Sequence, residues 1–297
     1  MVCFDRDLLR LLPPVLRARD FHLYLEGGKR LVDLWLEGGK AILGHKPPNI
    51  LRELKNSGER GLFSGLPHPM EHRFIKALNI FFPNRSFRIF TDETSLFKAL
   101  DEAGFRDLVL RDPAFPPAPP ALQDHENNSS DKEHIILWRP FLNPTEVSAE
   151  VPAEISAASI SIPVLPWPLS PRVLVFDKSL EGSFRSGNSR GELIPPVLLA
   201  PATRALYDLA ASLKAKTPNR GNPVFPKIDK ALKKSIWRRR GIYLTVDQDF
   251  SKENYAALFS QFLEGGFLIP PSKAEPAILP GSMSSGEEVK LAALLEE

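Results

Sequence analysis

Proline is the residue that most limits what this chain can fold into. The sequence contains 29 prolines in 297 residues, about twice the usual share of about 5%. Proline has a fixed φ angle and no N–H group, so it ends helices and is kept out of central strands. Residues 113–120 read PAFPPAPP, and residues 123–133 read QDHENNSSDKE. We therefore expect polyproline and polar loop structure in the middle of the chain, with irregular structure over 144–171.

Segments of regular structure lie on both sides of this middle region. Residues 21–25 and 30–36 read as strands around a Gly-Gly turn, which predicts a hairpin. Residues 87–90 form a short strand that is followed by a polar loop and a helix to about residue 103. This order of strand, loop and helix is typical of α/β proteins, and the length allows two domains. Further elements are predicted in the second half, with strands at 134–138, 172–177 and 241–246 and helices at 203–213 and 251–264.

The composition excludes several classes of protein. Lys and Arg total 38 and Asp and Glu total 36, and the resulting net charge of +2 argues against binding to a polyanion through bulk charge. The single cysteine, Cys3, cannot form an internal disulfide, and the histidine pair His68 and His72 lacks further ligands, so we expect no metal site. No run of 18 apolar residues is present and charges interrupt the N-terminus, which predicts a cytoplasmic protein without a membrane helix or secretory signal.

Two separated stretches carry a recognisable pattern. The first runs from Gly28 to Leu34 (GKRLVDL) and continues from Ile42 to Pro47 (ILGHKP). The second runs from Phe259 to Glu275 and contains Gly-Gly-Phe at 265–267 and Ile-Pro-Pro-Ser at 269–272. In this order, near the two ends of one chain, these motifs resemble the class III aminotransferases of the fold-type-I pyridoxal-phosphate (PLP) superfamily. Within that family the glutamate-1-semialdehyde 2,1-aminomutase subgroup is the most similar.

The resemblance implies an architecture and an assembly. The fold would be a reduced PLP-transferase, with a mostly parallel sheet in a large domain over 63–214 and an α+β small domain built from 1–62 and 215–297. Such enzymes are dimers, and this chain is shorter than a complete member in the middle. A dense group of phenylalanines would then leave apolar surface uncovered, so we expect a homodimer or pairing with an intact relative. These phenylalanines are Phe81, Phe82, Phe87, Phe90 and Phe97.

The resemblance also implies positions for the cofactor. Its phosphate would lie at a helix N-terminus, where Thr94 and Ser95 could donate hydroxyl groups. Asp92 and Glu93 bring negative charge to the same loop, and aspartate at a helix start is also a good N-cap. The pyridine nitrogen would pair with Asp177, at the end of a predicted strand. The alternative for Asp177 is a carboxylate that caps the next turn.

The lysine that would bind the cofactor is missing from its implied position. In the family it follows the aspartate strand, but residues 179–213 contain no lysine. Lys178 and Lys214 are the remaining alternatives. Adjacent strand residues point to opposite faces, so Asp177 and Lys178 could not both address one ring without a bulge. Arg139 also stands where the resemblance implies an acid.

These losses predict a non-catalytic aminotransferase-like protein with a scaffold or regulatory role and no cofactor. The alternative is a working PLP-dependent aminotransferase or aminomutase that acts on an amino acid. In that case Asp177 would hold the pyridine nitrogen, and Lys178 or Lys214 would supply the amine.

A basic segment provides a second alternative function. On a helix, residues 230, 233, 234 and 237 would share one face, and a cationic stripe with an aromatic residue could bind nucleic-acid phosphates. The simpler interpretation is a solvated helix face, so we expect neither a nucleic-acid nor a membrane partner. The cations that surround Trp237 are Lys227, Lys230, Lys233, Lys234, Arg238, Arg239 and Arg240, opposed by Asp229.

Overall fold

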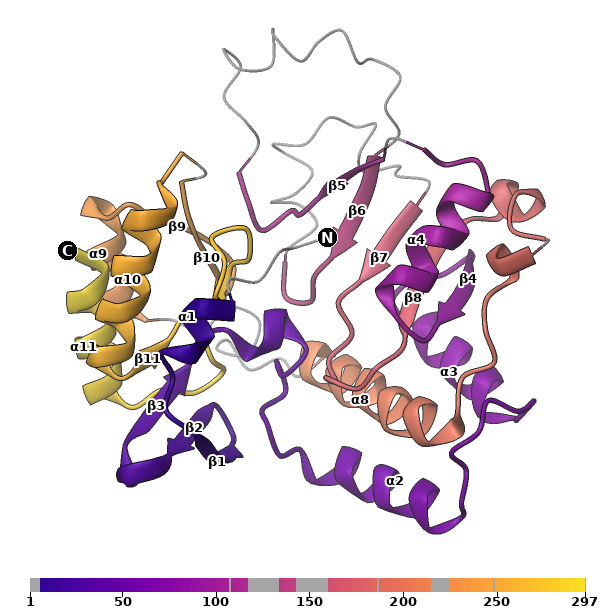
Figure 1. Ribbon diagram of the computed structural model, residues 1–297, viewed down its shortest axis with the longest axis horizontal. Helices are drawn as coiled ribbons and strands as arrows, with labels where there is room; N and C mark the ends of the chain where they lie inside the picture. Colours follow the sequence, from indigo (N-terminus) through magenta and orange to yellow (C-terminus); the bar gives the residue numbers. More distant parts are fainter. Residues whose placement is uncertain are drawn as a thin grey trace, which may run out of the picture. The chain divides into compact units, whose positions relative to one another are not determined.

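The chain folds into two compact units (Figure 1). Unit 1 contains residues 1–47 and 211–297, and unit 2 contains residues 48–210. We expected boundaries after residues 62 and 214, but helix α2 (Pro48–Glu59) groups with unit 2. The computed structural model describes residues 6–106, 108–116, 134–142, 160–185, 187–214, 225–247 and 249–296. The polar loop expected at 123–133 and most of the proline-rich middle lie outside these described residues.

Unit 1 contains two small sheets and four α-helices among its described residues. Its elements are α1 (Arg6–Arg10), β1 (Val15–Arg19), β2 (His22–Leu25), η1 (Glu26–Gly28), β3 (Arg30–Asp33), η2 (Leu36–Gly39), α9 (Pro226–Ala231), η5 (Leu232–Lys234), β9 (Trp237–Arg240), β10 (Tyr243–Val246), α10 (Lys252–Gly265), β11 (Phe267–Leu268), β12 (Ala277–Ile278) and α11 (Ser285–Glu296). One sheet has the order β1-β2-β3-β11 and the other has the order β12-β10-β9. The hairpin expected around the Gly-Gly turn is the antiparallel pair β2–β3.

The parallel pairing of β3 with β11 joins the two ends of the chain. Leu268 pairs with Asp33 in this ladder. The backbone N–H of Val32 donates to the carbonyl of Gly266 at 2.9 Å, and that of Leu34 donates to Leu268 at 2.8 Å. The two stretches that carry the family resemblance therefore lie side by side, and each supplies a strand to the same sheet.

Asp33 is a buried carboxylate that organises the N-terminal motif. It is 2% exposed. One carboxylate oxygen accepts the backbone N–H groups of Trp35 at 2.8 Å and Leu36 at 3.0 Å, and the other lies 2.8 Å from Nε2 of His45. The indole N–H of Trp35 donates to Glu275 at 2.8 Å. The first motif is thus fixed internally by Asp33 and linked to the second motif through Trp35.

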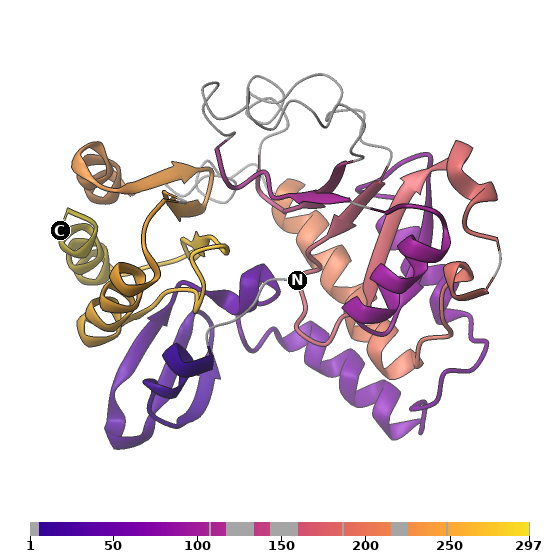
Figure 2. The same cartoon turned by 45° about the horizontal axis from the view of Figure 1, so that its top comes forward.

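Unit 2 is built around one five-stranded sheet. Its elements are α2, α3 (Met70–Leu78), β4 (Arg85–Phe90), α4 (Glu93–Glu102), β5 (Val109–Arg111), β6 (His134–Trp138), β7 (Ile160–Pro163), β8 (Arg172–Asp177), η3 (Lys178–Gly182), η4 (Gly187–Arg190) and α8 (Pro196–Lys214). The strand order is β4-β8-β7-β6-β5. Strand β8 is antiparallel to both of its neighbours, and the other four strands share one direction. The expected α/β fold with a mostly parallel sheet is confirmed, and Figures 1 and 2 show α4 and α8 on opposite faces of the sheet.

The apolar core of unit 2 follows the alternation of side chains along its strands. Leu174 and Phe176 of β8 belong to a buried cluster that includes Leu96 and Leu100 of α4. Successive strand residues point to opposite faces, so the buried Val175 between them faces the other side of the sheet. Both faces of the sheet are therefore apolar, as expected for a sheet covered by helices on both sides.

The phenylalanines expected to leave apolar surface are mostly inside unit 2. Phe90 is fully buried and Phe87 is 9% exposed. Phe81 and Phe82 pack edge-on against Trp138, with ring centroids 5.4 Å and 5.1 Å apart. Phe97, on α4, packs against the buried cluster that includes Leu174 and Phe176 of β8. The prediction that these residues form an uncovered surface was wrong, because β4, α4 and β6 use them as core.

Two strands occur where the sequence predicts other structure. Strand β7 lies within the segment expected to be irregular, and it pairs with both β6 and β8. It spans four residues and ends in proline, which hides its alternation. Strand β9 begins at Trp237, where a helix face was expected, and it pairs with β10. Strand β7 is thus stabilised by strands that are distant in sequence, and β9 is stabilised by the strand that follows it across a turn.

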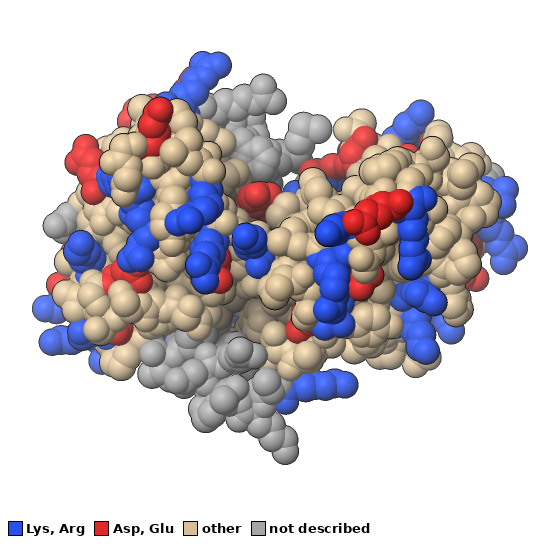
Figure 3. Space-filling view, turned by 90° about the horizontal axis from the view of Figure 1, so that it is seen from below, with Lys and Arg blue, Asp and Glu red and all other residues tan. Residues whose placement is uncertain are grey.

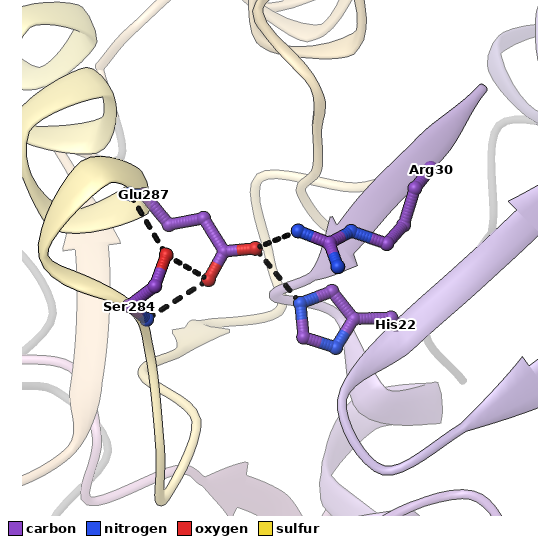
Figure 4. Close-up of polar contacts among 4 residues, drawn as sticks. All are labelled: His22, Arg30, Ser284 and Glu287. Atoms are coloured by element: carbon purple, nitrogen blue, oxygen red, sulfur yellow. Dashed lines mark hydrogen bonds and ion pairs between the residues drawn. The ribbon is translucent and has the colours of Figure 1, made fainter.

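A polar cluster holds the C-terminal helix α11 on strands β2 and β3 of the β1-β2-β3-β11 sheet (Figure 4). One oxygen of Glu287 accepts a hydrogen bond from Arg30 at 2.8 Å and lies 2.9 Å from Nε2 of His22. The other oxygen accepts the backbone N–H and the hydroxyl of Ser284, each at 2.9 Å. Burial raises the pKa of Glu287, but hydrogen bonds from Ser284 and His22 outweigh burial and lower it to about 2.

We expect Glu287→Gln to lower the free energy of unfolding near neutral pH. The variant's free energy of unfolding should also change less between pH 7 and pH 3 than that of the wild type. The pKa of Glu287 falls from 4.5 in the unfolded chain to about 2 in the folded protein. A shift of this size converts to about 3.4 kcal/mol, and solvent screening at this partly exposed group reduces it to about 2–3 kcal/mol. This contribution is present above pH 4.5 and is lost as the pH falls towards 2. Urea unfolding at pH 7, 4 and 3 measures this difference between wild type and variant.

Glu296→Gln, at the exposed end of α11, is the matched control and should leave stability unchanged. If wild type and Glu287→Gln lose stability in parallel below pH 4.5, the carboxylate of Glu287 is not the group that titrates.

Candidate functional site

The candidate site is the edge of the unit 2 sheet at which four strands end. Carboxyl ends of parallel strands gather at one edge, and the loops that follow them carry binding groups in α/β proteins. This edge receives Thr91 after β4, Asp112 after β5, Arg139 after β6 and Val164 after β7. The ends of β6 and β7 remain joined, because the N–H of Val164 donates to the carbonyl of Trp138 at 2.9 Å.

The chain's own carboxylates hold the backbone N–H groups where α4 begins. Asp92 is the N-cap of α4, and its side chain accepts the N–H of Ser95 at 2.8 Å. Glu192, which precedes α8, accepts the N–H of Thr91 at 2.7 Å. Burial raises the pKa of Glu192, but hydrogen bonds from Thr91 and Ser95 outweigh burial and lower it. Thr94 and Ser95 therefore lie in the first turn of α4, where carboxylates already take donors that a phosphate would use.

A buried ion pair joins the ends of β5 and β6. The Nε of Arg139 donates to one oxygen of Asp112 at 2.8 Å, and an Nη donates to the other oxygen at 2.6 Å. The two side chains are 3% and 15% exposed. Asp112 also accepts the N–H of Ala114 at 3.0 Å. The guanidinium that replaces the implied acid is thus neutralised within the chain.

Asp177 lies at the opposite end of the same sheet. The β4–β8 register pairs Asp177 with Arg85 at the start of β4, and it pairs Arg172 with Phe90 at the end of β4. Arg172 and Asp177 are five residue steps apart along β8, which corresponds to about 17 Å. Because β8 is antiparallel to its neighbours, its carboxyl end meets their amino ends. The structure therefore does not bring Asp177 together with Thr94 or Ser95.

At its own end of the sheet, Asp177 caps the turn that follows. It accepts hydrogen bonds from the N–H and the hydroxyl of Ser179, both at 2.9 Å. Arg85 lies 3.6 Å from its other oxygen. The hydrogen bonds from Ser179 lower the pKa of Asp177. The side chain thus has the geometry of a turn cap.

The candidate lysines are exposed. Lys178 follows Asp177 and so lies at the same end of the sheet, away from α4. Lys214 is the last residue of α8 and belongs to unit 1. The remaining described lysines of unit 2 are also exposed: Lys55, Lys76 and Lys98. The described part of unit 2 therefore has no buried lysine.

Asp112 and Glu192 are the site residues that sequence reasoning missed. Neither belongs to a recognisable motif, and each acts on a residue from another element. The available signal for Asp112 was its position just after a short apolar run and before a proline, which suits the end of a strand.

No three His, Cys, Asp or Glu side chains within the described ranges lie together as metal ligands. None of the described helices is long and apolar enough to span a membrane.

We expect Asp112→Ala to lower the free energy of unfolding by about 3–5 kcal/mol, because it leaves a guanidinium buried without its carboxylate. Asp101→Ala is the control. It breaks a pair with Arg106 whose side chains are 66% and 76% exposed, and it should cost less than about 1 kcal/mol. Urea unfolding followed by circular dichroism measures both. The double variant Asp112→Ala/Arg139→Met should recover part of the stability that Asp112→Ala loses, because it also removes the buried guanidinium. If Asp112→Ala and Asp101→Ala lower the free energy of unfolding equally, the Arg139–Asp112 pair has no structural role.

Comparison with known proteins gives distant sequence relatives. No family model matches the chain. An uncharacterised protein of Treponema pallidum is 27% identical over 94% of this chain and 93% of its own length. The glutamate-1-semialdehyde 2,1-aminomutase of Clostridium acetobutylicum is 35% identical over 23% of this chain and 16% of its own length. The enzyme of the same name from Thermus thermophilus is 33% identical over 24% and 17%. The matches to the aminomutases thus cover a small part of those enzymes.

Solved structures resemble the chain over nearly its whole length. The ornithine aminotransferase of Plasmodium yoelii has a TM-score of 0.66 at 12% identity, covering 98% of this chain and 96% of that one. An omega-transaminase from Sphaerobacter thermophilus has a TM-score of 0.64 at 12% identity, covering 96% and 90%. The acetylornithine aminotransferase of Elizabethkingia anophelis has a TM-score of 0.64 at 12% identity, covering 99% and 98%. The chain therefore has the fold of the class III aminotransferases, in a shortened form.

Proposed function

We propose that this protein is an aminotransferase-like protein without catalytic activity, and that it serves as a scaffold or regulatory protein. The placement of lysine carries the proposal. Between Lys132 and Lys214 the sequence has one lysine, Lys178, and this residue lies at the sheet end opposite α4. Covalent attachment of PLP needs an amine within bonding distance of the cofactor's aldehyde. The fold of an aminotransferase is therefore retained in a chain whose described residues place no lysine at the edge where β4, β5, β6 and β7 end.

The charges at the carboxyl edge of the sheet support the same conclusion. The phosphate of PLP is an anion that is held by backbone N–H groups and cations. Here Asp92 and Glu192 accept backbone N–H groups at the start of α4. Glu93 adds a third carboxylate, which lies 3.8 Å from the guanidinium of Arg172. The cation of Arg139 is neutralised by Asp112. These residues do not fit the cofactor's phosphate.

We expect the purified protein to show no absorbance of a lysine-bound cofactor after incubation with PLP, and borohydride to trap no adduct at a defined lysine. Visible absorption and peptide mass spectrometry measure this, with an active aminotransferase as the positive control. Sparse labelling spread over exposed lysines supports the proposal. An adduct confined to one lysine, abolished by Lys178→Ala or Lys214→Ala and kept in Lys76→Ala, would establish the alternative of a PLP-dependent aminotransferase or aminomutase.

The scaffold role includes self-association, and an apolar surface on unit 2 supports it. Phe63 and Leu66, between α2 and α3, are 63% and 64% exposed, and Leu193 is 49% exposed. The two segments touch, because a Cβ atom on Gly65 would lie 2.2 Å from the carbonyl oxygen of Leu193. Apolar side chains grouped in this way mark association sites. We assign this surface to a homodimer in a cytoplasmic protein, since a single cysteine suits a reducing compartment.

We expect the wild type to be a dimer at micromolar concentration and Phe63→Ser/Leu66→Ser to shift it to monomer, because the substitutions remove apolar area from the interface. Size-exclusion chromatography with light scattering measures the mass, and circular dichroism checks the fold. Leu169→Ser changes an apolar side chain that is 53% exposed elsewhere in unit 2 and should leave the dimer intact. A monomeric wild type, or a complex with an intact relative in place of the dimer, would contradict this assignment.

A further inference from the structure

A short helix with four lysines forms a basic surface on unit 1. Helix α9 continues directly into η5, so residues 226–234 form one helical stretch. Its inner side carries the buried Ile228 and Ala231, and α9 packs against α11 (Figure 1). Its outer side carries four exposed lysines, which we call the lysine surface. They are Lys227, Lys230, Lys233 and Lys234.

The spacing of these lysines concentrates their charge. Lys227, Lys230 and Lys234 are three and four residues apart, which places them along one side of a helix. With a rise of about 1.5 Å per residue, this row is about 10 Å long. The fourth lysine lies beside the last one. Positive charges this close together produce a local field, even though the whole chain has a net charge of only +2.

The lysine surface has one carboxylate beside it, since Glu288 accepts the backbone N–H of Lys227 at 2.9 Å. The side chains of its four lysines make no hydrogen bond or ion pair with another described residue. The neighbouring arginines, by contrast, have carboxylate partners: Arg239 pairs with Asp229, and Arg238 lies 3.8 Å from Asp247. Figure 3 shows further Lys and Arg side chains on the face of the molecule seen from below.

Trp237 is not part of the lysine surface. It begins β9, is 4% exposed, and its ring centroid lies 5.5 Å from that of Phe262. The prediction that residues 230, 233, 234 and 237 share one helix face was wrong for Trp237, because the helical stretch ends at Lys234 and the chain then pairs with β10. Recognition at this surface therefore relies on charge and not on stacking with a base.

The chemistry of the surface favours one class of partner over two others. Lysine is depleted in protein–protein interfaces, where aromatic residues and arginine dominate. A helix that lies on a membrane directs its apolar side into the lipid, whereas Ile228 and Ala231 are buried within the protein. Phosphate groups on a polymer backbone are bound by lysines acting as point charges, which position the partner without reading its sequence.

We propose that the lysine surface binds the phosphodiester backbone of nucleic acid, independently of base sequence. The proposal concerns unit 1 and stands whether or not unit 2 binds a cofactor. Four phosphate contacts give a slope of log K against log salt concentration of about −3.6 for a duplex. Sequence-independent binding of this kind has a Kd of about 10⁻⁴ to 10⁻⁶ M at physiological salt. Each lysine removed should reduce the slope by about 1.

Fluorescence anisotropy with a labelled mixed-sequence duplex, measured over a range of salt concentrations, tests the proposal. The triple variant Lys230→Gln/Lys233→Gln/Lys234→Gln should lose most binding at low salt and reduce the slope by about 3. The control Lys55→Gln/Lys76→Gln/Lys98→Gln removes the same charge from exposed lysines of unit 2 and should bind as the wild type does. Circular dichroism of both variants confirms that they fold, since all six side chains are exposed.

Three results would overturn the proposal. The first is an equal loss of binding in the two triple variants, because the effect would then be bulk charge. The second is a wild type that does not bind the duplex at low salt. The third is binding to phosphatidylserine vesicles, lost in the Lys230/Lys233/Lys234 variant, with no binding to the duplex. A second duplex of different sequence with the same affinity supports recognition of the backbone.

Discussion

The parallel pairing of β3 with β11 is the interaction on which the rest of unit 1 depends. It joins segments from the two ends of the chain, so a long loop must be closed before the ladder can form, and the entropic cost of closure grows only slowly with loop length. Buried polar contacts then hold the joined ends, with Asp33 receiving two backbone N–H groups and Trp35 reaching Glu275. The cluster around Glu287 attaches the last helix to the same sheet. The recognisable motifs at the chain ends are therefore the residues that build one folding unit.

The direction of a single strand separates the expected site residues. Strand β8 runs against its four neighbours in the sheet, so Asp177 and Lys178 lie at the end opposite Thr94 and Ser95. At the carboxyl edge, Asp92, Glu192 and the Arg139–Asp112 pair satisfy one another's polar groups through the chain itself. A sheet edge that in other α/β folds binds a ligand is here stabilised by internal carboxylates. The fold and the proposed loss of chemistry are compatible, because the ion pair and the caps contribute to stability without a bound cofactor.

The two units present different chemistry to a partner. Unit 2 has a grouped apolar surface around Phe63, Leu66 and Leu193, next to a close approach that only Gly65 permits. Unit 1 has the lysine surface, whose apolar side is buried against α11. Apolar area favours association of folded chains, and unpaired lysines favour a polyanion. A scaffold protein needs surfaces of this kind more than it needs an enclosed pocket.

The sequence by itself determined the features that depend on local patterns. Alternating and amphipathic residues predicted β2, β6, β8, α4 and α10 near their observed positions, and the two motifs predicted the α/β fold with both chain ends in one domain. The absence of lysine from 179–213 is also a property of the sequence alone. Tertiary structure alone decided the direction of β8, the pairing of β7, the partners of Arg139 and Thr91, and the burial of Trp237 in a strand. Most of these features depend on hydrogen bonds and packing between residues far apart in the chain, and β9 depends on pairing with β10 across a turn. Such tertiary contacts override local propensity and leave no local signal in the sequence.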